Sequence, residues 1–473
     1  MREYLKFYID GRWVDPVELK TVNTVNPATE AISGTIALGS AADVDRAVQA
    51  ARKAFGSWSQ TSREERLKVL ERILVEYQKR SADLATAVTE EMGAPKGLAG
   101  GFHIGLGAGH LSTAIEILKS FKFEEQRGAT LIVKEPIGVC GMITPWNWPI
   151  NQVTVKVFPA LATGCTIVLK PSQESHFSAQ ILAEVFDAAG VPAGVFNLIQ
   201  GKGSIVGAAM ATHPGIDMIS ITGSEAAGIE VARNAAATVK RVCQELGGKS
   251  ANIVLDDADL ARNVAKGVTG MMINSGQTCS ATSRMLVPRS RMNDAIAAAR
   301  EAAASVTVGD PRGDFAMGPV VSKAQFNSVQ DYIQKGIESG ATLVAGGPGR
   351  PEGLTKGFYV KPTVFANVTN NMVIAREEIF GPVLTIIGYD SVDHAIGLAN
   401  DSDFGLAGNV AGTDLDKARA VARQIRAGWV SINDGFDFHA AFGGYKKSGN
   451  GREWGEFGFH EYLEVKSLLG YAP

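Results

Sequence analysis

The sequence predicts an α/β protein with two parallel, doubly wound sheets. From residue 139 onward, short apolar runs alternate with segments of helical periodicity, and a second alternating series begins at residues 251–255. Strands that alternate with helices are typical of parallel sheets joined by right-handed crossovers. The chain has 473 residues, which is too many for one ordinary core. We therefore expect two or three domains.

The composition is that of a soluble globular protein. Hydrophobic residues make up 45%, charged residues 20%, and the formal net charge is -3. There is no basic excess to attract nucleic acid and no Lys/Arg-rich run to attract a membrane surface. The apolar runs are too short for a signal peptide or a membrane span. We expect a cytoplasmic protein with no nucleic-acid or membrane partner.

Helices are expected first along the chain. Residues 40–55 place Val44, Ala47, Val48, Ala51 and Phe55 on one face. The overlapping boxes Thr61-x-x-Glu64 and Ser62-x-x-Glu65 begin a second helix. Gly93-Ala-Pro95 ends a third.

A run of alternating glycines at 105, 107 and 109 has two interpretations. It could form a phosphate-binding loop, but no strand precedes it. A helical pattern follows it at Leu111, Ile115 and Leu118. Close packing of a helix through small residues is the favoured interpretation.

Two series of strands are expected after this helical region. The first comprises 139–144, 166–170, 195–199, 218–222 and 240–244, with helices such as 177–189 and 226–237 between them. The second comprises 251–255, 360–365, 383–389 and 428–433. Ligands of such sheets bind at the carboxyl ends of the strands. Residues 124–134 and 459–471 also look strand-like, and both are plausible edges for pairing between subunits.

Cys279 is the cysteine whose surroundings suggest chemistry. It lies among small residues, whereas Cys140, Cys165 and Cys243 lie in or beside apolar runs and are expected to be buried. No Cys-x-x-Cys pair occurs, and the seven histidines lack metal-ligand spacing, so we expect no metal site. Glu245, which two glycines follow, offers a carboxylate that could take a proton from a thiol or from water.

Two polar side chains follow predicted strands. Asn147, in Thr144-Pro-Trp-Asn-Trp-Pro149, could donate to a developing oxyanion or could cap the next helix. Lys170 could reach a ribose hydroxyl or a phosphate, or could be a surface lysine.

Three further motifs are weak when each is taken alone. Gly223-x-x-x-x-Gly228 joins a strand to a helix whose N-terminus could face a pyrophosphate. The earlier Gly203 and Gly207 are only suggestive. Glu378 and Phe380 could contact a ribose and a nicotinamide, or could belong to a turn that ends a helix.

The order of these motifs closely resembles the aldehyde dehydrogenase superfamily. The specific blocks are Pro-Trp-Asn147, Glu245-Leu-Gly-Gly-Lys, Gly-Gln-x-Cys279 and Glu378-Ile-Phe-Gly-Pro. A Phe442-Gly-Gly-Tyr-Lys block follows, and the resemblance runs from about residue 26 to residue 466.

The resemblance implies a covalent mechanism. Cys279 would attack an aldehyde and form a thiohemiacetal, while Asn147 and the backbone N–H of Cys279 hold the oxyanion. A hydride would pass to a nicotinamide, and Glu245 would activate water to hydrolyse the thioester. Lys156 and Glu453 match family positions linked to proton relay, although they could equally form a structural ion pair. A coenzyme A-acylating semialdehyde dehydrogenase and a non-catalytic relative of the fold remain the alternatives.

The resemblance also implies a domain arrangement. A Rossmann-type cofactor domain would span 1–123 and 139–245, and an α/β catalytic domain would span 246–445. A small β oligomerisation element would comprise 124–138 and 459–473, in a homodimer or homotetramer.

The cofactor implied is NAD+, held by residues that match the family's cofactor positions. These are Ile143, Thr144, Pro145, Trp146, Lys170, Ser172, Gln173, Gly203, Gly207, Thr222, Gly223, Ser224, Gly228, Leu246, Glu378 and Phe380. Gln173 stands where NAD-preferring relatives often have Glu. A neutral amide does not repel a 2′-phosphate, so NADP+ is also expected to be tolerated. Glu225 stands where many relatives have Thr, and stabilising the helix dipole is its simplest role.

The access tunnel implied for the aldehyde is lined by seven residues. These are Trp148, Gln152, Val155, Thr278, Ser280, Phe436 and Phe442. They favour an aromatic or medium-chain aldehyde with a polar end, although Trp148 and the two phenylalanines could instead pack the core.

Overall fold

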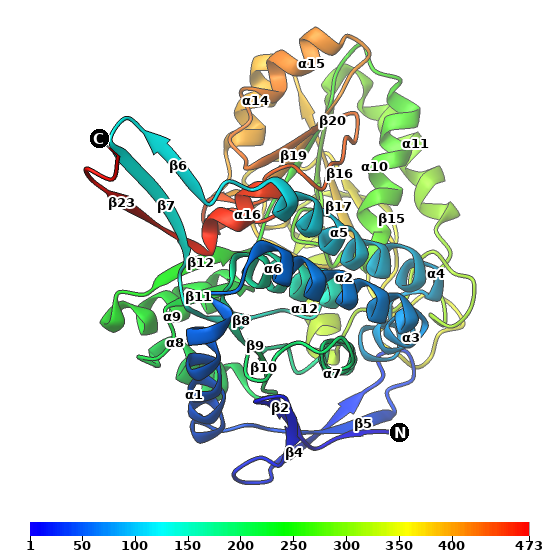
Figure 1. The fold of residues 1–473 in the computed structure, drawn as a ribbon. Helices are drawn as coiled ribbons and strands as arrows, with labels where there is room; N and C mark the ends of the chain where they lie inside the picture. The colour runs from blue at the N-terminus through cyan, green and yellow to red at the C-terminus, as the bar shows by residue number, and fades with distance from the viewer. Residues whose placement is uncertain (473) are drawn as a thin grey trace.

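The computed structural model describes residues 1–472, and two large sheets organise the chain (Figure 1). The first has eight strands in the order β22-β12-β11-β8-β9-β10-β2-β3, and its five central strands, β12 to β10, are parallel. The second has seven strands in the order β15-β16-β17-β14-β13-β19-β20, all parallel except the edge strand β15. The predicted α/β class with two mainly parallel sheets is confirmed.

Residues 1–245 contain seven of the eight strands of the first sheet, the separate three-stranded sheet β1-β5-β4 and the helices that accompany them. The strands are β1 (Arg2–Tyr4), β2 (Phe7–Ile9), β3 (Arg12–Val14), β4 (Thr21–Val25), β5 (Ile32–Ala37), β8 (Val139–Ile143), β9 (Thr166–Lys170), β10 (Phe196–Leu198), β11 (Met218–Thr222) and β12 (Arg241–Glu245). The helices are α1 (Ala41–Trp58), α2 (Arg63–Lys79), α3 (Ser81–Met92), α4 (Lys96–Leu98), η1 (Ala99–His103), α5 (Ile104–Ser120), α6 (Pro149–Thr163), α7 (His176–Ala188), η2 (Gly203–Gly207), α8 (Ala208–Thr212), α9 (Glu225–Ala235) and η3 (Ala236–Thr238).

Residues 246–461 contain the second sheet and its helices, the two-stranded sheet β18-β21, and β22, which is the edge strand of the first sheet. The strands are β13 (Ala251–Val254), β14 (Arg284–Pro288), β15 (Thr342–Ala345), β16 (Thr363–Ala366), β17 (Val383–Tyr389), β18 (Phe404–Gly405), β19 (Ala407–Ala411), β20 (Trp429–Ile432), β21 (Tyr445–Lys446) and β22 (Gly449–Asn450). The helices are α10 (Leu260–Met272), η4 (Ile273–Gly276), η5 (Arg289–Arg291), α11 (Met292–Ser305), α12 (Lys323–Glu338), α13 (Val373–Arg376), α14 (Val392–Asn400), α15 (Leu415–Ala422) and α16 (Gly455–Glu461).

Sequence signals account for several helix ends. Ser40 and Ser62 each form a capping box, with Asp43 and Glu65, at the start of α1 and α2. Gly93 ends α3 with φ 80°, a conformation that glycine adopts without steric cost. Helix α6 is buried along its whole length and therefore has no polar face exposed to solvent.

The glycine run lies in helix, as the favoured interpretation stated. Gly107 and Gly109 belong to α5. An added Cβ would lie 2.3 Å from the Tyr77 hydroxyl at Gly107 and 2.3 Å from the Phe438 ring at Gly109. These glycines let a side chain approach the helix backbone.

A three-stranded antiparallel sheet projects from the body of the molecule (Figure 1). It consists of β6 (Glu124–Arg127), β7 (Thr130–Pro136) and the C-terminal β23 (Leu463–Leu468). The prediction of a strand over residues 459–471 is wrong at its start. Residues 459–461 belong to α16, because a short apolar run has no period that separates strand from helix.

The parallel strands of the first sheet end together. Ile143 pairs with Lys170 and with Ile221, and Thr222 pairs with Glu245. These strand ends therefore form one edge, and the residues that follow β12 cross to β13 of the second sheet. Among residues 1–472, no helix combines the length and the apolar character needed to cross a membrane.

Candidate active site

Cys279 lies in the loop between η4 and β14. The turn η4, immediately before this loop, has an unusual backbone. Asn274 and Ser275 have φ of 55° and 56°, and Gly276 has φ of 72°. Such conformations cost energy in non-glycine residues and are common at functional sites. Cys279 is partly exposed, whereas Cys140, Cys165 and Cys243 are buried as expected.

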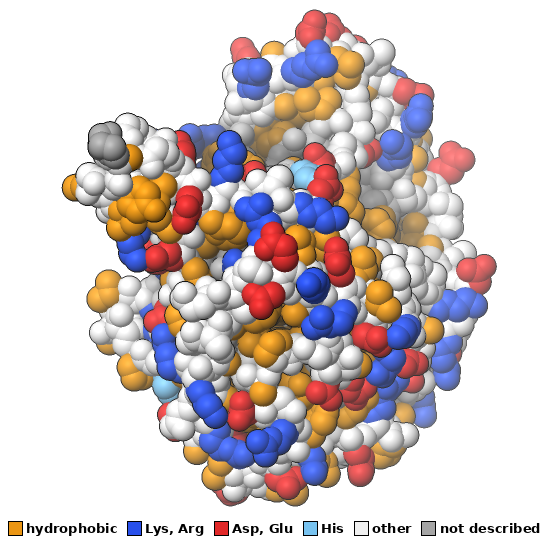
Figure 2. Space-filling view, in the orientation of Figure 1, with side chains coloured by type: hydrophobic (Ala, Val, Ile, Leu, Met, Phe, Trp, Pro, Cys, Tyr) orange, Lys and Arg blue, Asp and Glu red, His pale blue; other side chains and the backbone are white. Residues whose placement is uncertain are grey.

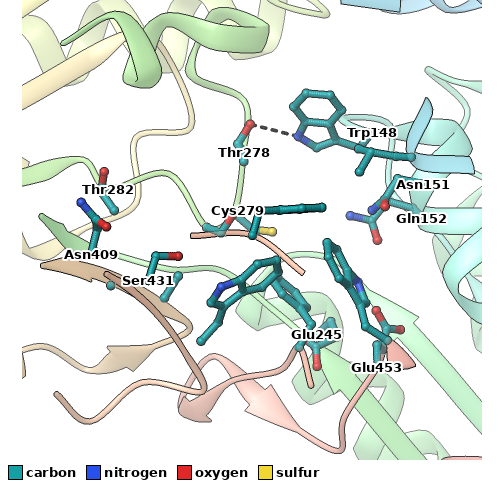
Figure 3. A pocket seen from close by; sticks show the side chains of 18 of the residues that line it. Trp148, Asn151, Gln152, Glu245, Thr278, Cys279, Thr282, Asn409, Ser431 and Glu453 are labelled. Atoms are coloured by element: carbon teal, nitrogen blue, oxygen red, sulfur yellow. Dashed lines mark hydrogen bonds between the residues drawn. The ribbon is translucent and has the colours of Figure 1, made fainter. Parts of the chain in front are cut away.

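Two cavities meet at Cys279. The first has a volume of about 320 Å³ and the second about 250 Å³, and Cys279 and Thr222 line both. Figure 3 shows Cys279 between Asn151 and Gln152 on one side and Thr282, Asn409 and Ser431 on the other. A molecule in either cavity can therefore reach the sulfur.

The first cavity has mainly aromatic walls. Six of the lining side chains are aromatic: Phe102, Trp148, Trp429, Phe436, Phe442 and Trp454. The indole N–H of Trp148 donates to the Thr278 hydroxyl at 3.0 Å (Figure 3). This bond ties the wall to the residue that precedes Cys279.

Six of the seven predicted tunnel residues line this first cavity. These are Trp148, Gln152, Thr278, Ser280, Phe436 and Phe442. Val155 requires a correction, because it lies outside this cavity. It is 3% exposed, packs in a cluster with Trp454 and Phe442, and borders a separate small cavity. Val155 lies three residues after Gln152 on the same face of α6, but it belongs to a buried cluster against which Cys279 packs and does not line the cavity itself.

The second cavity contains eight of the predicted cofactor residues. These are Pro145, Trp146, Thr222, Gly223, Ser224, Leu246, Glu378 and Phe380. The rings of Trp146 and Phe380 meet edge to face, with centroids 5.4 Å apart. Phe380 has φ of 56°. Glu378 accepts a hydrogen bond from the Gly248 N–H at 2.9 Å, and burial raises its pKa to about 7.

Lys170 and two other predicted residues lie together just beyond that cavity. An added Cβ at Gly207 would lie 3.7 Å from Ile143 and 3.9 Å from Lys170. Lys170 is buried rather than on the surface, its ammonium donates to the Pro171 carbonyl at 2.9 Å, and burial lowers its pKa to about 8.

The remaining predicted cofactor residues have mixed surroundings. Gly228 allows Leu246 to pack on α9, since an added Cβ would lie 2.6 Å from that side chain. Ser224 caps α9 by accepting from Ala227 N–H, and Glu225 follows in the first turn. Gly203 and Gly207 begin and end the π-helical turn η2.

Ser172 accepts a hydrogen bond from the Glu174 N–H, and the Gln173 backbone carbonyl contacts His176 at 2.7 Å. The Thr144 hydroxyl is buried without a partner.

Asn147 lies beside the sulfur loop and does not cap α6. The side-chain amide of Asn147 donates to the Gln277 backbone carbonyl at 3.1 Å. The backbone carbonyl of Asn147 accepts from the side-chain amide of Asn274 at 2.7 Å. The N-cap of α6 is Trp148, with no side-chain cap. A primary amide has two N–H groups, so Asn147 keeps one to donate into the second cavity, which it lines.

Glu245 ends β12 and is 2% exposed. Both of its carboxylate oxygens lack a hydrogen-bond partner, and the residue lines the first cavity with Cys279. Burial and the nearby Glu453 raise the pKa of Glu245 well above its usual range. A carboxyl group with a raised pKa in a cavity can act as a general base near neutral pH.

Cys279 itself is a poor nucleophile at rest. Burial and the charges of Glu378 and Glu245 raise the pKa of its thiol to about 12, while the backbone N–H groups of Ser280 and Cys279 lower it. The thiolate is the reactive form. Attack on a carbonyl therefore needs a base or a nearby positive charge.

Lys156 and Glu453 form a fully buried ion pair. The Lys156 ammonium lies 2.5 Å from Glu453 and 2.9 Å from the Ser220 hydroxyl. Glu453 also lines the first cavity, so the pair connects that cavity to the interior. The geometry allows both a structural ion pair and a proton relay.

Several lining residues were not predicted from the sequence. The first cavity also contains Phe102, Leu106, Thr282, Ala407, Gly408, Asn409, Trp429, Ser431, Asp434, Gly435 and Trp454, and the second also contains Gly247 and Gln325. These residues come from distant segments without a motif. Only Phe102, Trp429 and Trp454 had a usable signal, as large aromatic residues beside glycines. Among residues 1–472, no group of three or more His, Cys, Asp or Glu side chains is arranged to hold a metal ion.

Comparison with known proteins agrees with this site. The model of the "Aldehyde dehydrogenase family" matches residues 13–468. A 3-succinoylsemialdehyde-pyridine dehydrogenase from a Pseudomonas species is 52% identical, over 100% of this chain and 99% of its own length. The chain therefore belongs to the aldehyde dehydrogenase family.

Solved structures give the same result. A Cys-to-Ala mutant of aldehyde dehydrogenase C from Pseudomonas syringae, in complex with NAD+ and octanal, is 53% identical with a TM-score of 0.98, covering 99% of this chain and 97% of its own. An aldehyde dehydrogenase from Bartonella henselae is 45% identical with a TM-score of 0.98, covering 100% of both chains.

Proposed function

We propose that this protein oxidises aldehydes to carboxylic acids with NAD+, through a thioester on Cys279 that Glu245 helps to hydrolyse. The observation that carries the proposal is the position of Cys279 at the junction of two cavities. One cavity suits an apolar aldehyde. The other contains eight of the sixteen residues predicted to hold a dinucleotide.

The second cavity fits NAD+ on chemical grounds. Thr222 in this cavity has a buried hydroxyl without a partner, as does Thr144, which precedes the lining residue Pro145. Lys170, on the strand that pairs with β8, has a buried ammonium bonded only to a backbone carbonyl. Trp146 and Phe380 offer ring surfaces, and Glu378 offers an acceptor for ribose hydroxyls. Related structures contain NAD+, which supports the same cofactor here. When bound, the nicotinamide supplies the hydride acceptor.

In the first step, the Cys279 thiol releases its proton to solvent, and the resulting thiolate attacks the carbonyl carbon while the C=O π electrons move to oxygen. The free N–H of the Asn147 amide and the backbone N–H of Cys279 are the donors available to that oxyanion. When the oxyanion collapses, the C–H bond breaks with loss of hydride, and a thioester of Cys279 remains.

In the second step, water must attack the thioester. Glu245 is suited to take a proton from this water, because its two oxygens have no other partner and its pKa is raised. The acid leaves, and the Cys279 thiol is restored. Lys156 and Glu453 then offer an internal route for the proton.

Hydrolysis is favoured over transfer of the acyl group to coenzyme A. Family members that acylate coenzyme A often lack the carboxylate at Glu245. Its presence in the first cavity supports release of the free acid. The intact set of Asn147, Glu245 and Cys279 disfavours a non-catalytic relative.

The substrate class follows from the first cavity. Its aromatic walls suit an aromatic or medium-chain aldehyde, and Asn409, Ser431 and Thr282 provide polar contacts for a polar end. A relative named for a pyridine semialdehyde and another bound to octanal support the same class. Gln173 leaves room for NADP+ as an alternative cofactor, which activity with millimolar NADP+ would test.

A homodimer or homotetramer is proposed as the assembly. The projecting sheet exposes apolar side chains, with Val465 67%, Leu469 82% and Tyr471 61% exposed. Figure 2 shows hydrophobic side chains gathered on this projection. Apolar side chains on a protruding edge favour pairing with a second copy. The oligomerisation role of 124–138 and 459–473, the other domain boundaries and the cytoplasmic location stay predictions.

The test is NADH formation with a panel of aldehydes, with product analysis in the presence and absence of coenzyme A. Turnover to the free acid, abolished in Cys279→Ala, supports the proposal. An acyl-CoA product would favour the alternative. Activity in Cys279→Ala equal to that of the parent would refute the role of the thiol.

A further inference from the structure

Trp454 separates the substrate cavity from a second, smaller space. Its indole lines both the first cavity and a cavity of about 20 Å³ behind it. That small cavity is lined mainly by apolar side chains, among them Ala114, Ile117, Val155 and Phe459. No other residue lines both spaces.

The backbone at Trp454 is strained. Its φ and ψ are 66° and 155°, a region that is essentially restricted to glycine. Gly455 follows with φ 53°, and an added Cβ there would lie 2.2 Å from the His439 carbonyl oxygen. A bulky residue in such a conformation persists only where its surroundings hold it, which suggests a functional reason for its position.

Aromatic neighbours hold the indole in place. Phe442 and Phe438 stack on it at interplanar angles of 20° and 24°, with centroids 5.3 and 6.0 Å away. Trp429 and His110 each meet it edge to face at 4.7 Å. Trp454 is only 8% exposed. The indole is therefore a fixed wall, because no single rotation frees it from these contacts.

We propose that Trp454 is the residue that limits the length of aldehyde accepted by the cavity. This inference rests on the proposed function, since it concerns the same substrate. An alkyl group that extends from Cys279 along the aromatic wall stops at the indole, although apolar space continues behind it. Replacing the indole by a smaller side chain joins the two spaces and lengthens the channel.

The expected effect follows from burial of apolar surface. Each additional methylene buried contributes enough free energy to change kcat/KM about fourfold. In a variant with the joined space, an aldehyde two methylenes longer can bury both of them. The ratio of its kcat/KM to that of the shorter aldehyde should therefore rise about tenfold or more relative to the parent.

The experiment measures kcat/KM with NAD+ for linear aldehydes from butanal to decanal. We expect the optimum in Trp454→Leu to move at least two carbons longer than in the parent. Trp454→Phe keeps a ring between Phe442 and Phe438 and opens the wall less, so a smaller shift in the same direction is expected. This variant also provides the test if Trp454→Leu does not fold.

Two controls distinguish the loss of a cavity wall at Trp454 from a general disturbance of the active site. The double variant Trp454→Leu/Ala114→Leu refills the small cavity and should return the optimum toward that of the parent. Phe457→Leu, on α16, removes a ring that is 52% exposed and lines neither cavity, so it should leave the optimum unchanged.

The outcomes distinguish the two proposals. If the parent oxidises no aldehyde of the series, the proposed function fails. If the parent is active but both Trp454 variants keep its chain-length optimum, only the role of Trp454 is overturned. A uniform loss of kcat/KM at every length, caused by disturbance of the adjacent Glu453, would also overturn it.

Discussion

At the scale of single residues, the surroundings of Cys279 and Glu245 assign them different tasks. The thiol lies where both cavities meet, whereas the carboxylate has no partner and lines only the substrate side. In the proposed mechanism hydride loss precedes hydrolysis, so the two residues would act in different half-reactions. This separation gives each substitution its own kinetic signature.

Replacing the carboxylate of Glu245 should slow hydrolysis and spare acylation. In Glu245→Gln we expect steady-state turnover to fall about 10²- to 10⁴-fold, the usual contribution of a general base. A rapid first formation of about one NADH per site should survive, because the thioester still forms. Stopped-flow absorbance measures both phases. Loss of the rapid phase together with turnover would place Glu245 in acylation instead.

The pH dependence should follow the raised pKa values. Burial raises the pKa of the Cys279 thiol to about 12 and raises that of the Glu245 carboxyl well above its usual range, so both groups lose their protons more readily as the pH rises. Both must lose a proton to act, and activity should therefore rise with pH. We expect kcat/KM to increase from about pH 6 to about pH 9. A profile that falls over this interval would contradict the assigned protonation states.

The residue types at the site could largely be predicted from sequence, but their surroundings could not. Asn147, Glu245 and Cys279 each lie in a motif, and the structure brings all three to the two cavities. Trp454 and Asp434 owe their places to backbone φ of 66° and 62°, which no local pattern indicates. Val155 shares a face of α6 with Gln152, so the helical period could not show that it packs behind the cavity wall instead of lining the cavity.

At the scale of elements, the most regular strands were predicted best. Residues 166–170, 218–222 and 383–389 were predicted with the bounds that β9, β11 and β17 have. Strand β19, which lies between β13 and β20, was not predicted, because Gly408 and Asn409 disfavour strands and only its neighbours stabilise it.

Helix α5 allows a matched test of glycine packing. Gly107→Ala should destabilise the protein by about 1–3 kcal/mol, because the new methyl meets Tyr77 and Ile150. Gly105 has open space at its Cβ position, so Gly105→Ala should be neutral or stabilising by up to about 1 kcal/mol. Thermal unfolding of the pair measures the difference. Equal stability of the two variants would contradict the packing role of the glycine run.

At the scale of the whole molecule, the cavities lie between the two large sheets, and we propose that a second copy of the chain pairs with the projecting sheet. Strand β23 pairs with β7, which lies more than 300 positions earlier in the chain, from Leu463↔Pro136 to Leu468↔Leu131. Such long-range pairing explains why the sequence alone could suggest strand-like edges but not their partners.

Charge on the projecting sheet should weaken assembly. We expect Val465→Glu/Leu469→Glu to lower the molar mass in solution relative to the parent, because it buries charge at a subunit contact. Light scattering after size-exclusion chromatography measures the mass. Val75→Glu, on α2 and 50% exposed, serves as the control and should leave the mass unchanged. A monomeric parent would contradict the proposed oligomer.

The most direct test of covalent catalysis at Cys279 is intact and peptide mass spectrometry of Glu245→Gln after mixing with NAD+ and octanal. We predict one added octanoyl group per chain, located on the peptide that contains Cys279 and absent from Cys279→Ala/Glu245→Gln. An unmodified chain with NADH formed in stoichiometric amount, or an acyl group on another residue, would contradict the account.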